Sequence, residues 1–270
     1  QVENGQMDVR LEINSHDEME IIADGFNKMV ERLNDYINQV YVARICQKDA
    51  ELNALKMQIQ PHYLYNTLDV IRMTALEKND EKTAELLECL AHQLRYVMGE
   101  HTDCIVLRDE LQALREYFVI MKVRYEGRIR LSIQVSDEDA QLYIPKLLLQ
   151  PVVENAIRHG LREKNGEGTV AIRVERKEDY LEIVVMDDGV GMEEEQVRIM
   201  QETLDNPEIG KTDANGRLSV GMKNVYDRIK LNCGKEYGFG IESFQGVGTI
   251  VTYRLPIWEE PEDVESSDRG

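Results

Sequence analysis

The stretch QIQPHYLYNTLDVI, residues 58–71, sets a proline and a histidine side by side in a sequence otherwise typical of a helix. Pro61 removes a backbone donor and clashes with the preceding turn, so it marks a bend or a boundary. The apolar residues that follow recur at helical spacing and form one face. They are Leu64, Leu68, Ile71 and Ala75. His62, Asn66 and Asp69 fall on the opposite face, which we expect to be open to solvent.

The segment before the proline, residues 34–60, contains no Gly or Pro and predicts a continuous signalling helix. Two apolar stripes run along it. The stronger has the spacing of a coiled-coil seam, and the weaker lies on the opposite face. The first consists of Leu52, Leu55 and Ile59, and the second of Ala50, Ala54 and Met57. The weaker stripe continues into the face after Pro61, so the proline can transfer packing from one face to the other, and both stripes remain candidates for the partner-facing side.

A second amphipathic helix is predicted at residues 81–99 and a third at 107–125. The polar loop EKNDEK joins the first two into a helical hairpin. A hairpin cannot bury two apolar faces alone, and two hairpins from two copies of the chain solve this as a four-helix bundle. His92, in the second helix, is expected to serve packing or to lie on the surface.

The pattern changes near residue 128, where we place the main domain boundary. RIRLSIQV alternates apolar and polar residues, as do TVAIRV and LEIVVMD, and GTIVTYRLP is also typical of a strand. Helical segments are predicted between them at about 144–160, 193–203 and 222–232. These elements predict an α/β layer, a sheet with helices on one face.

The first of three candidate motifs in this unit is LLLQPVVENAIRHG, residues 147–160. It predicts an apolar helix that carries Glu154, Asn155, Arg158 and His159. A carboxamide oxygen suits Mg²⁺, and a basic side chain one turn later can meet phosphate. A helix with an ordinary polar face toward solvent explains this stretch alone equally well.

The second motif is VVMDDGVGM, residues 184–192, in which a strand ends at Asp187 and Gly189 and Gly191 allow a close turn. A carboxylate there can accept a hydrogen bond from an adenine amino group. The third is GRLSVGMKNV, residues 216–225, where Gly221 and Asn224 begin a helix whose free N–H groups suit phosphate. The polar, glycine-punctuated stretch between these motifs predicts a lid.

Composition excludes several classes of function. A net charge of −19 argues against nucleic acid and anionic membrane surfaces as direct partners. The four cysteines have no zinc spacing and predict free thiols, and no apolar run approaches a transmembrane length. The acidic end, residues 258–270, predicts a disordered tail. GKT at 210–212 is no P-loop, because position 205 is Asp where a glycine is required.

Together and in this order, the motifs resemble the histidine-kinase-type ATP-binding domain, a Bergerat-type α/β sandwich. QIQPHYLYNTLDVI, LRDELQALREYFVIMKVRYEGRI and IPKLLLQPVVENAIRHG closely resemble the LytS/YesM-type sensor histidine kinases, and DEMEIIADGFNKMVERL resembles the second half of a HAMP linker. The resemblance covers residues 17–256. It implies a HAMP-like part at 1–33, phosphotransfer and dimerisation helices at 61–127 and an ATP-binding domain at 128–257.

The resemblance also implies roles for individual residues. His62 would accept the γ-phosphoryl group of ATP, and Asn155 would coordinate Mg²⁺ with Glu154 beside it. Asp187 would bind the adenine amino group. The pocket would be completed by Gly189, Gly191, Gly221, Asn224 and the far strand at Gly246, Gly248 and Thr249. Two departures stand out: Ser219 occupies a position where the lid often has glycine, and Tyr63 follows His62 where many relatives carry an acid.

The function implied is ATP-dependent autophosphorylation of His62 followed by transfer to an aspartate on a response-regulator receiver domain. Asn66, one turn from His62, can orient a phosphate or a water. The chain would be the cytoplasmic part of a homodimeric receptor, joined to the membrane through an upstream segment. Two alternatives remain: an ATP-gated conformational ATPase of the chaperone or mismatch-repair type, and a non-catalytic signalling scaffold. The helical hairpin argues against the first, and Asn155 with Asp187 against the second.

Overall fold

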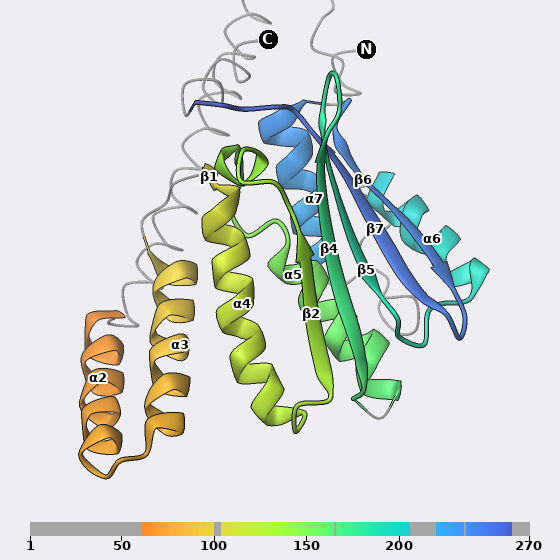
Figure 1. Ribbon diagram of the computed structural model, residues 1–270. Coiled ribbons are helices and arrows are strands. Elements are labelled where there is room, and N and C mark those ends of the chain that lie inside the picture. Colours follow the sequence, from red (N-terminus) through yellow and green to blue (C-terminus); the bar gives the residue numbers. More distant parts are fainter. Residues whose placement is uncertain (1–60, 100–103, 165, 206–219, 235, 261–270) are drawn as a thin grey trace, which may run out of the picture. The chain divides into compact units, whose positions relative to one another are not determined.

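The computed structural model describes residues 61–99, 104–164, 166–205, 220–234 and 236–260 (Figure 1). By compactness the chain divides into residues 1–63 and 64–270. The expected HAMP-like part, the signalling helix, part of the predicted lid and most of the acidic tail lie outside the described residues. Within the described residues, no helix is both long enough and apolar enough to span a bilayer.

The predicted helical hairpin is confirmed as α2 (Pro61–Glu77) and α3 (Glu81–Met98). Asp80 caps α3, because its carboxylate accepts hydrogen bonds from the Thr83 backbone N–H at 3.1 Å and from the Thr83 hydroxyl at 2.7 Å. Asn79 adopts a left-handed conformation with φ of 57° in the connecting turn, a conformation that asparagine tolerates. A short polar loop therefore reverses the chain as the sequence predicts.

The hairpin leaves much of its apolar surface uncovered. On the predicted buried face Ala75 is buried and Leu64 and Leu68 are half-buried, but Ile71 is 46% exposed. Other large apolar side chains of the hairpin are also exposed, namely Val70, Met73, Leu76, Leu90 and Val97. A single copy of the chain therefore leaves the predicted buried face of α2 partly exposed to solvent.

The α/β unit is built on a five-stranded sheet in the order β2-β4-β5-β7-β6. Its strands are β2 (Ile129–Gln134), β4 (Gly168–Arg176), β5 (Leu181–Asp187), β6 (Gly238–Phe244) and β7 (Gly248–Leu255). β2 pairs with β4 in parallel and the other pairs are antiparallel. Alternate residues of β4 and β5 are buried, which confirms the period-two pattern that predicts them.

Helices cover one face of this sheet, as predicted (Figure 1). They are α4 (Leu107–Arg124), α5 (Gln150–Asn155) with its π-helical continuation η3 (Ala156–Leu161), and α7 (Val220–Cys233). A further helix, α6 (Glu194–Asp205), packs beside β6. Short 3₁₀ turns are η2 (Asp139–Gln141) and η4 (Arg162–Lys164), and β1 (Cys104–Val106) pairs with β3 (Tyr143–Pro145).

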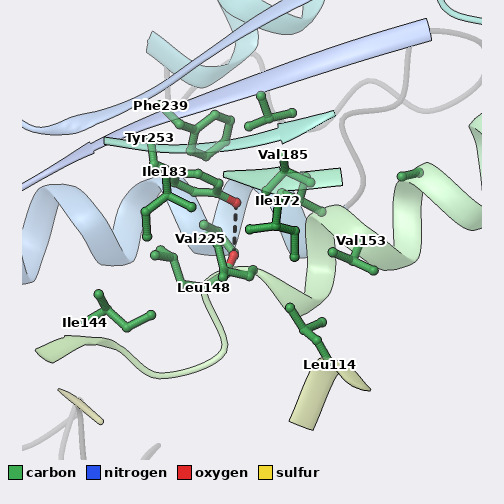
Figure 2. Packing of buried hydrophobic residues seen from close by; sticks show 14 of the residues in the cluster. Leu114, Ile144, Leu148, Val153, Ile172, Ile183, Val185, Val225, Phe239 and Tyr253 are labelled. Atoms are coloured by element: carbon green, nitrogen blue, oxygen red, sulfur yellow. Dashed lines mark hydrogen bonds between the residues drawn. The ribbon is translucent and has the colours of Figure 1, made fainter. Parts of the chain in front are cut away.

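The core lies between these helices and the sheet (Figure 2). Tyr253 of β7 is fully buried there, and its hydroxyl donates to the Leu148 carbonyl at 3.0 Å. Leu114 and Phe118 of α4 belong to the same core. By packing, α4 therefore belongs with the sheet, although it lies before the boundary expected near residue 128.

Two expectations about elements need correction. The helix predicted from about residue 144 begins only at Gln150, because β3 and a turn at residues 146–149 come first. The sequence pattern predicts no strand at β1, β3 or β6. The first two strands are only three residues long, and β6 contains two glycines, which weaken a strand pattern.

Candidate functional site

Asp187 is the last residue of β5, at the end of a buried strand. Its Oδ1 accepts a hydrogen bond from the Gly189 backbone N–H at 2.9 Å, and the backbone N–H of Thr249 on the paired strand also donates to this carboxylate. Burial nevertheless raises the pKa of Asp187 to about 6. The result is a largely enclosed carboxylate, held in place by backbone donors, that is ionised at neutral pH.

Glycines allow the chain to close tightly around this carboxylate. A Cβ on Gly160 would lie 2.7 Å from Asp187 Oδ1, and a Cβ on Gly189 would lie 2.5 Å from the Gly160 backbone. Gly248, with φ of +140°, lies so close to the Asp187 backbone that a side chain has no room. Gly191 likewise takes φ of +66° against the Phe244 carbonyl. Of these four, Gly160 is not among the predicted site residues, although it ends the first motif.

Backbone hydrogen bonds join the loop after β5 to the end of η3 and to the turn between β6 and β7. The Val190 N–H donates to the Gly160 carbonyl at 3.1 Å, and the Gly246 N–H donates to Val190 at 2.6 Å. Ser243, which the sequence does not single out, accepts from the Met192 N–H at 2.9 Å and contacts the Thr249 hydroxyl at 2.9 Å. Only pairing of β6 with β7 brings Ser243 here, and no local signal reports that pairing.

Asn155 is the last residue of α5, and it is partly buried. The helix continues directly into η3, which reaches Gly160 and hence the Asp187 loop. Such π-helical turns are rare and often occur at functional sites. Asn155 is thus placed one and a half turns before the contact with Asp187. Much of the His159 side chain in η3 is exposed, and its partial burial together with the nearby Arg158 charge lowers its pKa.

Glu154 and Arg158 lie on a different face of the same helix. They line a hollow of about 390 Å³ against α4 and η4, with Ile157 and with residues that include Tyr117 and Arg124. The other lining residues are Met121, Tyr125 and Arg162. Glu154 also accepts a hydrogen bond from the Gln150 amide at 2.9 Å. The structure therefore places these two residues in a hollow that Asp187 does not line.

Gly221 and Asn224 lie in the first turns of α7, spaced so that they share a helix face. Asn224 is exposed and Gly221 is partly buried. The predicted lid is the stretch between the second and third motifs; its first half forms α6, and its second half lies outside the described residues, as do Gly216 and Ser219. The start of α7 therefore has the glycine and the helical N-terminus that the third motif predicts.

His62 is the second residue of α2, and its side chain is exposed. Asn66, one turn further along, is exposed as well. The helix supplies the outward direction that the sequence predicts for both. His62 and Asn66 lie far from Asp187 in the sequence. The candidate phosphoryl acceptor and the candidate nucleotide carboxylate therefore belong to different parts of the chain.

The side chains present suit a nucleotide and a magnesium ion. The enclosed Asp187 carboxylate offers an acceptor for an exocyclic amine, and the glycines keep its surroundings free of side chains. Among the described residues, no cluster of three acidic, histidine or cysteine side chains is arranged to hold a metal. One carboxamide is still adequate for Mg²⁺, which usually combines one or two protein ligands with water and substrate phosphates.

Three family models match parts of the chain. Residues 50–129 match the histidine kinase family model, residues 143–259 match the histidine kinase-, DNA gyrase B- and HSP90-like ATPase model, and residues 1–35 match the HAMP domain. The chain is 30% identical over 246 residues to the sensor histidine kinase YesM of Bacillus subtilis, covering 91% of this chain and 40% of YesM. It is 26% identical over 242 residues to the sensor protein kinase HptS of Staphylococcus aureus, covering 86% of this chain and 45% of HptS.

The chain thus spans less than half the length of these curated relatives. Among solved structures, the histidine kinase domain of the blue-light activated histidine kinase EL346 from Erythrobacter litoralis aligns with 16% identity. That alignment has a TM-score of 0.43 and covers 83% of this chain and 99% of the other.

Proposed function

We propose that the chain is part of a sensor histidine kinase and transfers the γ-phosphoryl group of ATP to His62, a proposal supported by its matches to the histidine kinase and ATPase family models and to YesM. The phosphoryl group then passes to an aspartate of a response-regulator receiver domain. One observation carries the proposal: the same chain has an exposed histidine near the start of α2 and an enclosed carboxylate at the end of β5.

The chemistry at His62 follows from its exposure. A neutral imidazole has a nucleophilic nitrogen at neutral pH. That nitrogen attacks the γ-phosphorus, a P–N bond forms, the bond to the β–γ bridging oxygen breaks, and ADP leaves while the ring loses its other proton to solvent. Little covalent assistance is needed, because phosphoryl transfer depends mainly on positioning and charge neutralisation.

The α/β unit supplies the positioning. Asp187 accepts a hydrogen bond from the adenine amino group, and the backbone N–H groups of Gly189 and Thr249 hold its carboxylate in place. Asn155 presents its carboxamide oxygen to Mg²⁺, and the metal ion neutralises phosphate charge when bound. The start of α7, with Gly221 and Asn224, directs backbone N–H groups toward the phosphates. Arg158 adds positive charge on the same helical segment as Asn155, and His159 beside it offers a neutral imidazole.

The exposed apolar face of the hairpin supports a homodimer. Two copies of α2 and α3 pack into a four-helix bundle in which Ile71 and its neighbours become buried. The HAMP match at residues 1–35 supports attachment to the membrane through a segment upstream of this chain, with the kinase on the cytoplasmic side.

Incubation with labelled ATP and Mg²⁺ tests the proposal. The wild-type chain is expected to become a phosphoprotein that is labile in acid and stable in base, as a phosphohistidine is. The His62→Gln variant, which keeps a polar side chain of similar size on an exposed position, is expected to carry no label. His92→Gln is a matched control, because His92 lies on α3 and should leave labelling unchanged.

The destination of the phosphate decides between functions. Label that remains in His62→Gln contradicts the proposed acceptor. Release of inorganic phosphate without protein labelling in the wild type indicates a conformational ATPase instead. Addition of a purified receiver domain should then move label from the kinase to an aspartyl phosphate, which is labile in base.

A further inference from the structure

Glu110 of α4 is a carboxylate with no exposed surface, which is unusual for an acidic residue. Burial raises its pKa, and hydrogen bonds from Tyr96 and the backbone oppose that shift. Its Oε1 accepts from the Leu149 N–H at 2.9 Å and from the Gln150 N–H at 3.4 Å, and its Oε2 accepts from the Leu147 N–H at 3.0 Å. A carboxylate is rarely buried unless several donors satisfy it, as they do here.

These three N–H groups belong to the turn that begins α5. The residue at the N-cap of α5 is Leu149, which has no side chain able to accept the free N–H groups of the first turn. Glu110 performs that task from 39 residues away in the sequence. A negative charge at a helix N-terminus also interacts favourably with the helix dipole. Glu110 therefore fixes where α5 starts, and Asn155 lies at the other end of this short helix.

The turn itself adopts a conformation that its sequence does not favour. Leu147 has φ of 59°, in the left-handed region where the Cβ of an L-residue crowds the following carbonyl. The turn is held from the sheet by Tyr253, which donates to Leu148, and from α7 by Arg228, which donates to the Lys146 carbonyl. The Glu110 carboxylate completes these restraints, since it receives the Leu147 N–H itself.

The remaining donor to Glu110 comes from the phosphoacceptor hairpin. The Tyr96 hydroxyl of α3 donates to Glu110 Oε2 and also accepts from the Leu147 N–H at 3.3 Å. Burial and the Glu110 charge raise the pKa of Tyr96, so the phenol keeps its proton. The carboxylate that fixes the start of α5 therefore also contacts α3.

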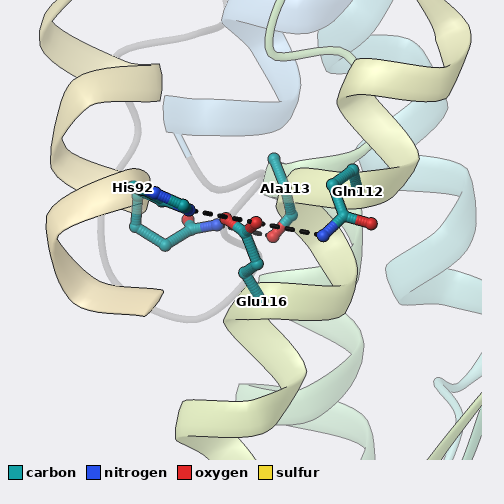
Figure 3. A network of polar contacts seen from close by, with 5 residues as sticks. His92, Gln112, Ala113 and Glu116 are labelled. Atoms are coloured by element: carbon teal, nitrogen blue, oxygen red, sulfur yellow. Dashed lines mark hydrogen bonds and ion pairs between the residues drawn. The ribbon is translucent and has the colours of Figure 1, made fainter. Parts of the chain in front are cut away.

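Polar side-chain contacts join α3 to α4, and Figure 3 shows those around Glu116. His92 lies 3.3 Å from Glu116, and the buried Gln93 amide donates to the Ala113 carbonyl. Glu116 in turn accepts from Gln112 on its own helix at 3.0 Å. The Gln93 contact is buried and directional, so it holds one register of α3 against α4 and is lost when α3 shifts, whereas the His92–Glu116 contact is exposed and contributes little.

We propose that Glu110 is a positioning residue that sets the register of α5, and with it Asn155, and that Tyr96 couples this register to helix α3. The proposal rests on the proposed function, in which Asn155 faces the magnesium ion. A movement of the hairpin that withdraws the Tyr96 hydroxyl leaves Glu110 short of one donor, and the start of α5 adjusts. The nucleotide site thereby responds to the state of the hairpin through one buried carboxylate.

Ligand binding without catalysis provides the test. Mg²⁺–ADP depends on Asn155, whereas adenosine reports only on the Asp187 end, so isothermal titration with both ligands separates the two. Glu110→Gln is expected to weaken Mg²⁺–ADP about tenfold, the loss of one hydrogen bond to a charged group, and to leave adenosine affinity unchanged. Tyr96→Phe is expected to weaken Mg²⁺–ADP about threefold, and to add nothing in the Glu110→Gln background because the two residues act through one contact.

Glu116→Gln is the matched control, since it makes the same chemical change on the same helix and contacts His92 and Gln112 instead of α5. It should change neither affinity. Equal losses for both ligands in Glu110→Gln, or unchanged Mg²⁺–ADP affinity in Tyr96→Phe, overturn the proposal. Should Glu110→Gln fail to fold, Tyr96→Phe alone decides. A chain that shows this pattern but never labels His62 rejects the proposed function and leaves the positioning role intact.

Discussion

The helical hairpin and the α/β unit differ in how far each completes its own packing. In the α/β unit, apolar residues from four helices and the sheet form one buried core, and glycines bring backbone segments into contact around Asp187. In the hairpin, Ile71 remains 46% exposed on the face that it shares with Leu64, Leu68 and Ala75. The α/β unit thus buries its apolar core within one chain, whereas the hairpin needs a partner surface to bury its apolar face. Substitutions in one region should therefore affect nucleotide binding, and substitutions in the other should affect association.

The largest expected effect is at a close backbone contact beside Asp187. Gly189→Ala puts a Cβ 2.5 Å from the Gly160 backbone and 2.7 Å from Asp187 Oδ1. We expect adenosine affinity to fall about 100-fold and the free energy of unfolding to drop by about 3 kcal/mol, the upper range for overpacking. Titration calorimetry and thermal unfolding measure the two effects.

Gly240→Ala is the matched control for this substitution, because nothing lies within 4 Å of its added Cβ. We expect a change of less than about 0.5 kcal/mol in stability and none in affinity. An unchanged adenosine affinity in Gly189→Ala would show that the close packing of these glycines does not shape the nucleotide site. Substitutions in the α/β unit would then not be distinguished from those in the hairpin by their effect on nucleotide binding.

A smaller effect is expected on the hairpin. Ile71→Glu places a charge on the face that two copies are proposed to bury, and sedimentation should show dimer affinity reduced about 30-fold from lost apolar burial and charge desolvation. Adenosine affinity should not change. Met73→Glu makes the same substitution at an exposed residue on the opposite face of α2 and should leave the dimer intact. Equal weakening by both variants would place the interface elsewhere.

The smallest effect concerns pH and belongs to the α/β unit alone. The pKa of Asp187 rises from 3.8 to about 6 on burial, so the carboxylate gains a proton as pH falls through about 6. Since the ionised form is the better acceptor, adenosine affinity should fall about tenfold between pH 7.5 and about pH 5. The stability of the ligand-free fold should change in the opposite direction. The contribution of a group with a raised pKa is present below its unfolded value and is lost as pH rises through about 6.

Asp187→Asn removes this titration, so its affinity for adenosine should be low and independent of pH over the same range. A pH dependence that survives the substitution assigns the titration to another group. Dimer affinity should not follow the same curve, because Asp187 lies at the end of β5 and outside the hairpin.

The sequence predicts what depends on local pattern and fails where distant segments meet. Alternation in LEIVVMD and the proline and apolar spacing after Pro61 predict β5 and α2, and strand-end chemistry singles out Asp187. Gly160, Ser243 and Glu110 are missed. Each acts through contacts with residues at least five positions away, and mostly far more, that only the folded chain brings together. Glu110 in particular occupies a position where helical periodicity alone suggests nothing unusual.

One measurement tests the central claim most directly, that the phosphoacceptor and the nucleotide carboxylate belong to separate parts of the chain. The dissociation constant for ADP and the extent of labelling by ATP are determined on the same preparation of His62→Gln. We expect labelling to be absent and ADP affinity to match the wild type within about twofold, because an exposed side chain on α2 takes no part in holding nucleotide. Labelling that persists, or ADP affinity that collapses together with it, contradicts this division.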